Sequence, residues 1–209
     1  MRKTTIAAAA ALSVAGGSLA VAGQVNDDAA KLPSQRGGKV SVPASVSPSL
    51  TADFAVFREA RTPADGLTRL ARGGLLRVAG TMQGANLDLS RRLETGDASR
   101  RAWVVPAVDA LCWVIQHAKD AASSTCAPVA IASAGRAFSV ASGSAYRVRP
   151  GEVVFSGMMP DGVRAVTLIA RNGARRTVEV RDNFYLSRGA DAVSISWVQN
   201  GSTHRFRVG

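Results

Sequence analysis

The sequence predicts an α+β fold in which two short N-terminal helices pack on a mostly antiparallel β domain. Three observations support this prediction. Between residues 62 and 96, capping residues precede spaced leucines, a pattern typical of short helices. From Ala102 onward, short runs of Val, Ile, Trp and Phe alternate with turn residues, as they do in antiparallel sheets. Two Asn-Gly pairs, at 172–173 and 200–201, each separate two such runs and predict tight type I′ hairpins.

Composition is that of one folded domain of ordinary size. The chain has 209 residues, of which 46% are hydrophobic and 20% charged, which is neither a collagen-like nor a disordered composition. Lys and Arg total 26 against 15 Asp and Glu, a net charge of +11, and all but four of the basic residues are arginine. This excess is compatible with an anion-binding surface, and equally with the codon bias of a GC-rich genome acting on solvated positions.

The N-terminus predicts export. Arg2 and Lys3 precede an uncharged, largely apolar run over residues 4–22 that ends in Ala-Val-Ala, a small-x-small cleavage pattern. Residues 1–22 are therefore expected to form a signal peptide, with the mature chain secreted or associated with the cell envelope. An uncleaved anchor is the alternative, but two glycines and a serine dilute the run. No transmembrane segment is expected in the mature chain.

The next segment, residues 23–50, is predicted to be a flexible leader. It is rich in Ser, Pro and Gly, lacks apolar periodicity and contains Pro33, Pro43 and Pro48. A single folded domain is expected over residues 51–209, helical over 51–100 and β-rich over 101–209.

The first helix is expected after Thr62, which can act as its cap. Pro63 suits the first turn and Asp65 favours the helix dipole. The leucines that follow supply an apolar side, and the Gly73-Gly74 pair is expected to end the helix.

The second helix is expected between Asn86 as cap and Gly96 as terminator. Leu89 and Leu93 lie one turn apart, and Asp88 is placed to reach an arginine on the next turn.

Ten strands are expected after residue 100. In two of them, 177–181 and 204–208, apolar and polar residues alternate, which predicts one buried and one wet face. The expected strands are 103–105, 111–116, 137–141, 145–149, 152–156, 163–170, 175–181, 184–187, 192–198 and 202–208.

The two cysteines, Cys112 and Cys126, are expected to form a disulfide because an exported chain folds in an oxidising compartment. A redox pair is normally Cys-x-x-Cys, and a zinc site needs two further ligands. The only histidines are His117 and His204. No metal and no cofactor are therefore expected.

Catalytic residues are not identified by any motif. The mature chain has no G-x-S-x-G, no P-loop and no dinucleotide or calcium pattern. One alternative is an extracellular hydrolase that uses His117 as a base, or a pair of carboxylates that converge in the fold; proximity of His117 to Asp109 or Asp120 and a serine would favour it. Asp161 lies in a Pro-Asp-Gly-Val sequence that turn geometry alone explains.

Arginines on the predicted strands are candidates for an anion-binding face, Arg205 and Arg207 above all, because alternation places both on one side of a strand. Aromatic residues make up only 5% of the chain, which does not favour specific nucleic-acid binding. An anionic cell-wall polymer is the partner that suits an exported cationic protein.

The leading hypothesis is thus a non-catalytic secreted or envelope domain. A third hypothesis is a secreted protein inhibitor that presents a bridge-tied loop at 123–126.

Several segments together resemble a family of uncharacterised secreted proteins of actinobacteria. They are 54–58, 61–65, Leu111-Cys112 with the later Cys126, the turn at 160–163, and Asn-Phe-Tyr at 183–185. The resemblance covers about residues 52–208. It implies one exported domain with paired cysteines and no known activity; Met159 stands where the family is expected to have Val.

Overall fold

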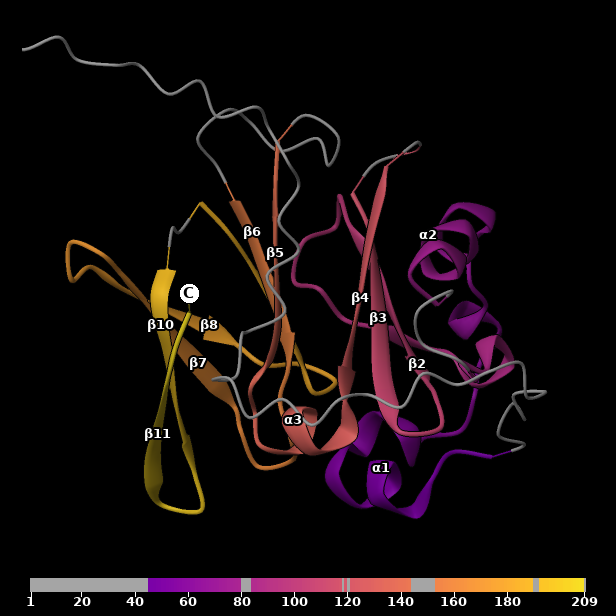
Figure 1. Cartoon of the computed structure of the whole chain (residues 1–209), viewed down its shortest axis with the longest axis horizontal. Coiled ribbons are helices and arrows are strands. Elements are labelled where there is room, and N and C mark those ends of the chain that lie inside the picture. The colour runs from indigo at the N-terminus through magenta and orange to yellow at the C-terminus, as the bar shows by residue number, and fades with distance from the viewer. Residues whose placement is uncertain are drawn as a thin grey trace, which may run out of the picture.

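Three antiparallel sheets form successive layers of the molecule. The structure is a computed structural model and describes residues 45–79, 84–117, 119, 121–143, 153–189 and 192–208. The first sheet has the order β1-β2-β3-β4, the middle sheet β5-β6-β9, and the outer sheet β11-β10-β7-β8. Figure 1 shows the outer sheet on the left, the middle sheet beside it and the first sheet toward the helix α2 on the right.

The strand bounds are as follows. The first sheet contains β1 (Arg91–Leu93), β2 (Arg101–Pro106), β3 (Ala110–Gln116) and β4 (Ala122–Pro128). The middle sheet contains β5 (Ala137–Ser142), β6 (Val153–Met158) and β9 (Phe184–Arg188). The outer sheet contains β7 (Ala165–Ala170), β8 (Arg175–Glu179), β10 (Ala192–Gln199) and β11 (Ser202–Arg207).

The middle sheet is buried on both faces. On one face, Met158 and Phe184 join a core with Trp113 of the first sheet. On the other face, Phe155 and Tyr185 join a second core with the outer sheet. Because successive side chains of a strand point to opposite faces, one short strand can supply both cores.

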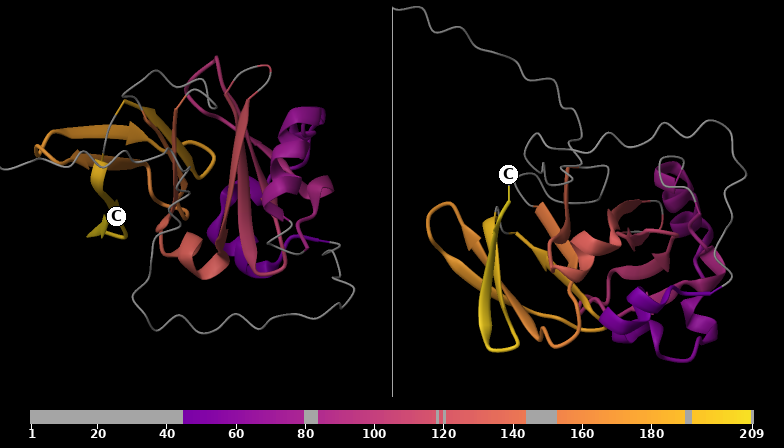
Figure 2. Two further views of the ribbon diagram at one scale, coloured as in Figure 1. Left: turned by 45° about the horizontal axis from the view of Figure 1, so that its top comes forward. Right: turned by 60° about the horizontal axis from the view of Figure 1, so that its bottom comes forward.

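The helices lie at the margins of these layers. They are α1 (Pro48–Asp53), α2 (Arg69–Ala79) and α3 (Val129–Ser133), with 3₁₀ turns η1 (Ala55–Phe57), η2 (Pro63–Asp65) and η3 (Leu87–Leu89). Helix α2 lies against β3 and β4, and Figure 2 shows it at the opposite side of the molecule from the outer sheet.

The Gly73-Gly74 pair does not end the first predicted helix, because α2 continues to Ala79. A Cβ at Gly74 would lie 3.5 Å from side-chain atoms of Val114 and Ala122. Such a distance is an ordinary van der Waals contact, so the position does not require a glycine; packing of α2 on β3 and β4 carries the helix through the pair despite its low helix propensity.

The second predicted helix is wrong. Asn86 does cap a turn, since its side chain accepts from Asp88 N, but that turn is only η3. The chain then forms β1, and Leu93 is buried in the core. Strand pairing and core burial thus override the leucine spacing. The prediction of a mostly antiparallel β fold is confirmed, whereas the predicted pair of helices is not.

Ordered structure begins earlier than the predicted domain start at residue 51. Pro48 starts α1, and Leu50 has no exposed surface. The predicted leader therefore overlaps the fold at its last residues, while residues 23–44 lie outside the described residues, as do the signal peptide and the expected strand at 145–149.

The two predicted hairpins form, but only one has the predicted turn. Asn200 and Gly201 both have positive φ, 50° and 75°, as a type I′ turn requires. At the other hairpin Gly173 has a φ of 82° whereas Asn172 is not left-handed, so a wider turn joins β7 to β8. The predicted alternation is confirmed: Val178 and Phe206 pack against the core while their neighbours face outward.

The cysteine pairing is confirmed. Cys112 on β3 lies directly opposite Cys126 on β4, and the sulfur atoms are 2.05 Å apart. The strand β4 was not predicted. It contains residues 123–126, so the bridge-tied inhibitory loop expected there is instead a strand of the first sheet.

Candidate functional site

Asp161 joins the N-terminal segment to the middle and outer sheets. Its Oδ1 accepts from Ala55 N at 2.8 Å and its Oδ2 from an Arg58 nitrogen at 2.6 Å. Its main-chain N donates to Asp53 O at 2.8 Å. The side chain thus holds the start of the fold to the turn that follows β6.

Asn183 completes this junction, which we call the Asp161 clamp (Asp161, Asn183, Arg58 and the main chain of 53–56). Its Oδ1 accepts from Val56 N at 3.1 Å, and its Nδ2 donates to Asp161 Oδ1 at 2.9 Å. Three segments that carry the family resemblance, 54–58, 160–163 and 183–185, therefore meet here.

The clamp is suited to structure rather than catalysis. Burial raises the pKa of Asp161, but hydrogen bonds from Asn183, Arg58 and Ala55 outweigh that effect and hold the pKa below its ordinary value. A carboxylate with every oxygen engaged by donors from its own fold is a poor proton acceptor for a substrate.

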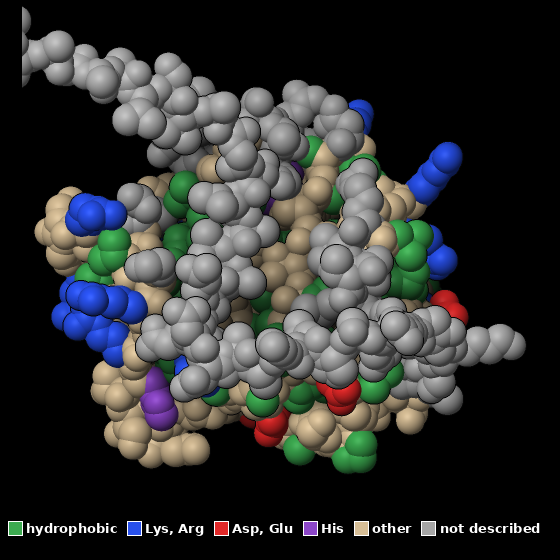
Figure 3. All heavy atoms as spheres, in the orientation of Figure 1, with side chains coloured by type: hydrophobic (Ala, Val, Ile, Leu, Met, Phe, Trp, Pro, Cys, Tyr) green, Lys and Arg blue, Asp and Glu red, His purple; other side chains and the backbone are tan. Residues whose placement is uncertain are grey.

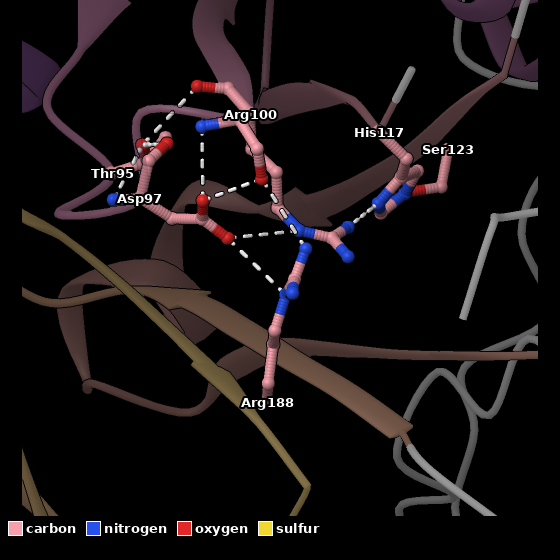
Figure 4. Close-up of polar contacts among 7 residues, drawn as sticks. Thr95, Asp97, Arg100, His117, Ser123 and Arg188 are labelled. Carbon is pink, nitrogen blue, oxygen red and sulfur yellow. Dashed lines mark hydrogen bonds and ion pairs between the residues drawn. The ribbon is translucent and has the colours of Figure 1, made fainter. Parts of the chain in front are cut away.

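His117 lies in a buried polar network, shown in Figure 4. It follows β3, and its Nε2 lies 2.6 Å from Ser123 Oγ on β4. Its Nδ1 contacts the guanidinium of Arg100, a residue that is 3% exposed. The structure thus places a histidine next to a serine, as the base and the nucleophile of a serine hydrolase would be placed.

The orientation of the imidazole is the reverse of what a hydrolase needs. A guanidinium can only donate hydrogen bonds, so Nδ1 must be the acceptor and the proton of the neutral ring lies on Nε2. The ring therefore donates to Ser123 and cannot remove its proton. A serine hydrolase instead uses a carboxylate at Nδ1 to keep the lone pair of Nε2 toward the serine.

The charge balance around His117 also opposes protonation. Burial, then Arg100 and Arg188, lower the pKa of His117 to about 4. Asp109, which we considered as a partner, lies in the turn at the far end of β3, and Asp120 lies outside the described residues.

Asp97 links the first and middle sheets through the same network. Its Oδ2 accepts from Arg100 Nε at 3.2 Å and forms an ion pair with Arg188 Nε at the same distance, and its Oδ1 accepts from Ser99. Burial raises the pKa of Asp97, but the Ser99 hydrogen bonds and the two arginines lower it further than burial raises it. The network thus consists of fold-stabilising ion pairs.

The outer sheet carries the predicted arginines on its solvent side. Ile195 and Trp197 point into the core, so the residues alternating with them on β10, Ser194 and Ser196, belong to the opposite face. Arg205 Nε donates to Ser194 Oγ at 3.2 Å, which places Arg205 on that face as well. Arg207, two residues further along β11, shares it.

Strand register continues this face across the sheet. Arg205 pairs with Ser196, Ser196 with Thr167, and Thr167 with Thr177. The neighbouring row ends in arginine at both edges. It runs Arg207, Ser194, Ile169, Arg175. We call the outward side of these two rows the arginine face: the exposed Arg175, Arg205 and Arg207 stand on the edge strands with Thr167 and Thr177 between them, whereas Ser194 and Ser196 are buried.

Within the described residues, the three arginines of this face form no ion pair. The one carboxylate on the same side of β8, Glu179, contacts Arg181 at 2.7 Å. The arginine face therefore presents uncompensated positive charge and free guanidinium donors, in contrast to Arg100 and Arg188.

Metal-binding clusters are absent from the described residues. Among them, no group of three or more His, Cys, Asp or Glu side chains is placed to hold an ion. Of the helices described, none combines the length and apolar composition that crossing a membrane requires.

No protein-family model matches the chain, and neither a curated protein nor a solved structure matches it. The resemblance to secreted actinobacterial proteins therefore stays a prediction, and function has to be argued from the site.

Proposed function

We propose that this chain is a non-catalytic domain, secreted or associated with the cell envelope, whose outer sheet binds an anionic envelope polymer. The observation that carries the proposal is the arginine face. It gathers Arg175, Arg205 and Arg207 on one side of one sheet, free of carboxylate partners within the described residues.

The chemistry of the face fits a chain of phosphate or carboxylate groups. Guanidinium groups bind such oxyanions through paired hydrogen bonds. Arg205 and Arg207 are separated by about 7 Å along β11, as alternate residues of a strand are. Successive anionic groups of an extended polymer can contact both, while the hydroxyl groups of Thr167 and Thr177 are placed to bond to its polar backbone.

Specific nucleic-acid binding is less well supported. Single-stranded nucleic acids are usually held by aromatic side chains that stack on the bases. The two rows of the arginine face contain no aromatic residue, because Trp197 and Phe206 point to the opposite side of the sheet.

The test is binding of poly(glycerol phosphate) to the mature protein, with uncharged dextran as the control polymer. We expect binding that weakens steeply with salt, because each charge contact releases counterions. The double variant Arg205→Gln/Arg207→Gln should lose most of it. The matched variant is Arg69→Gln/Arg72→Gln, which removes two exposed charges from α2 on the other side of the molecule.

Equal losses in the two double variants would mean diffuse attraction to net charge. No binding near physiological salt, where charges are screened over about 8 Å, would overturn the proposal.

Export is part of the same proposal and has its own test. The N-terminus of the protein recovered from culture medium or envelope is expected near Gly23, and retention of residues 1–22 in that material would contradict cleavage.

A further inference from the structure

A separate cleft lies beside the hairpin that joins β7 to β8. It has a volume of about 590 Å³, which is within the range of small-molecule sites. Its apolar wall is formed by Leu168, Ala170 and Ala174, and its basic rim by Arg171, Arg175 and Arg176. Figure 3 shows basic side chains gathered with apolar ones at the left edge of the molecule, where Figure 1 places this hairpin.

The rim arginines are available to a ligand. Within the described residues, Arg171 and Arg175 form no ion pair and no side-chain hydrogen bond, and Arg176 donates to the main-chain oxygen of Arg188. The three side chains are exposed. Three cations that pair with no carboxylate of the described residues create a favourable position for a multiply charged anion.

The wall of the cleft, unlike its rim, is apolar. Leu168 points to the core side of the outer sheet and is 1% exposed, and Ala170 lies two residues further along the same side. Apolar surface continues from this wall to Ala174 at the start of β8. A ligand in the cleft would therefore contact both the guanidinium groups of the rim and the apolar side chains of Ala170 and Ala174.

We propose that this cleft binds a phosphorylated amphiphile, a phosphate monoester carrying a hydrocarbon chain. A phosphate monoester has close to two negative charges at neutral pH and three terminal oxygen acceptors, which suits three guanidinium donors. The chain of the ligand lies along Ala170 and Ala174, over the buried Leu168. The cleft shares Arg175 with the arginine face, but Arg205 and Arg207, the residues varied in the polymer test, do not line it.

The experiment is calorimetric titration of the mature protein with octyl phosphate, below its micelle concentration. Inorganic phosphate supplies the charge alone, and octyl glucoside supplies the chain alone. We expect octyl phosphate to bind at least tenfold more tightly than either, since both ends of the cleft contribute.

Three variants locate the binding. Arg171→Gln should weaken octyl phosphate roughly tenfold, the loss expected for one charged hydrogen bond. Ala174→Phe keeps the charge but fills the cleft, and should weaken octyl phosphate without changing the affinity for poly(glycerol phosphate). The matched control, Arg72→Gln, removes an equally exposed charge from α2 and should change neither.

Two results would overturn the inference. Octyl phosphate that binds no better than inorganic phosphate would reduce the cleft to nonspecific anion attraction. An equal loss in Arg72→Gln and Arg171→Gln would show that overall charge, not the cleft, is responsible. Polymer binding can fail in the preceding test while octyl phosphate binding persists, so the two proposals fail separately.

Discussion

The first sheet and the outer sheet are both four-stranded and antiparallel, yet they treat charge differently. The first sheet is covered on both sides, by α2 on one face and by the middle sheet on the other, and six of the seven residues of β3 are buried. The outer sheet packs one face on the middle sheet, and its edge strands β8 and β11 are largely exposed, although Ser194 and Ser196 of the central strand β10 are buried on the other face.

Their charged residues follow this difference. Residues 91–128 of the first sheet contain five basic and four acidic residues, whereas the outer-sheet segments 165–179 and 192–207 together contain five basic residues and one acidic residue. Arg100 and Arg188 share Asp97, and His117 accepts from Arg100. A buried charge must be paired because desolvation is costly, whereas a charge in water can remain free for a ligand. The comparison teaches that the charges of the network are paired within the fold, whereas the arginines of the arginine face pair with no carboxylate of the described residues.

The largest effect is expected at the core between the first and middle sheets. Leu50→Ala should lower the free energy of unfolding by roughly 2–5 kcal/mol, because it leaves a cavity where the leucine side chain has no exposed surface. Urea unfolding measures the loss. Leu76→Ala on α2, where the leucine is 58% exposed, is the control and should change stability little. A small effect of Leu50→Ala would mean that α1 is not part of the folded core.

A somewhat smaller effect is expected from pH. The pKa of His117 falls from 6.5 to about 4 on folding, so as the pH drops the unfolded chain takes up the proton first. The contribution of neutral His117 to the free energy of unfolding is therefore fully present above about pH 6.5. It is lost as the pH falls from 6.5 to 4, by on the order of 3 kcal/mol. The carboxyl groups with lowered pKa, such as Asp97, contribute losses only below about 4, nearer the ordinary pKa of aspartate.

The variant His117→Gln should remove the decline between pH 6.5 and 4 in urea unfolding. His204→Gln should retain it, because His204 is an exposed residue that stacks on Trp197. If the decline persists in His117→Gln, another group titrates in this range and the network is not its source.

Loss of the clamp is expected to cost about 2 kcal/mol. Asp161→Ala leaves Ala55 N without its acceptor and removes one of the two acceptors of Asn183 Nδ2, which keeps its bond to Met159 O. The Arg58 pair adds little, since its side chain is 48% exposed. Asp109→Ala, which removes an exposed carboxylate, is the matched variant for thermal or urea unfolding. Equal effects of the two substitutions would mean that the clamp does not stabilise the fold.

Sequence alone predicted most strands of the middle and outer sheets, because their alternating residues and Asn-Gly turns are local signals. It missed β4, whose Ser-Ser-Thr run resembles a loop. In the structure these hydroxyl groups have specific partners: Ser124 donates to Gly74 O and Thr125 to Ser139 Oγ. Such long-range bonds replace apolar burial and leave no periodic pattern in the sequence.

The candidate sites show the same contrast between local sequence signals, which can be recognised, and long-range contacts, which cannot. Arg205 and Arg207 could be assigned to one face from their two-residue spacing. The clamp could not be found, because Ala55 and Asp161 are 106 residues apart. The role of His117 was equally hidden, since it depends on Arg100 contacting Nδ1, a detail that only the tertiary fold determines.

The smallest effect on stability, and the sharpest test of the comparison, is expected at the arginine face. Arg205→Gln/Arg207→Gln should change the free energy of unfolding by no more than about 0.5 kcal/mol, as solvated surface substitutions usually do, while polymer binding is largely lost. The one hydrogen bond removed runs from the exposed Arg205 to the buried Ser194 Oγ. The serine hydroxyl can still donate to a neighbouring acceptor, and relief of repulsion between like charges offsets the loss. Urea unfolding of the same preparation used for the binding assay gives both values. A loss of stability above about 1 kcal/mol would show that these arginines stabilise the outer sheet, as Arg100 and Arg188 stabilise the contact between the first and middle sheets. The absence of an ion pair would then no longer distinguish arginines that bind a polymer from arginines that stabilise the fold.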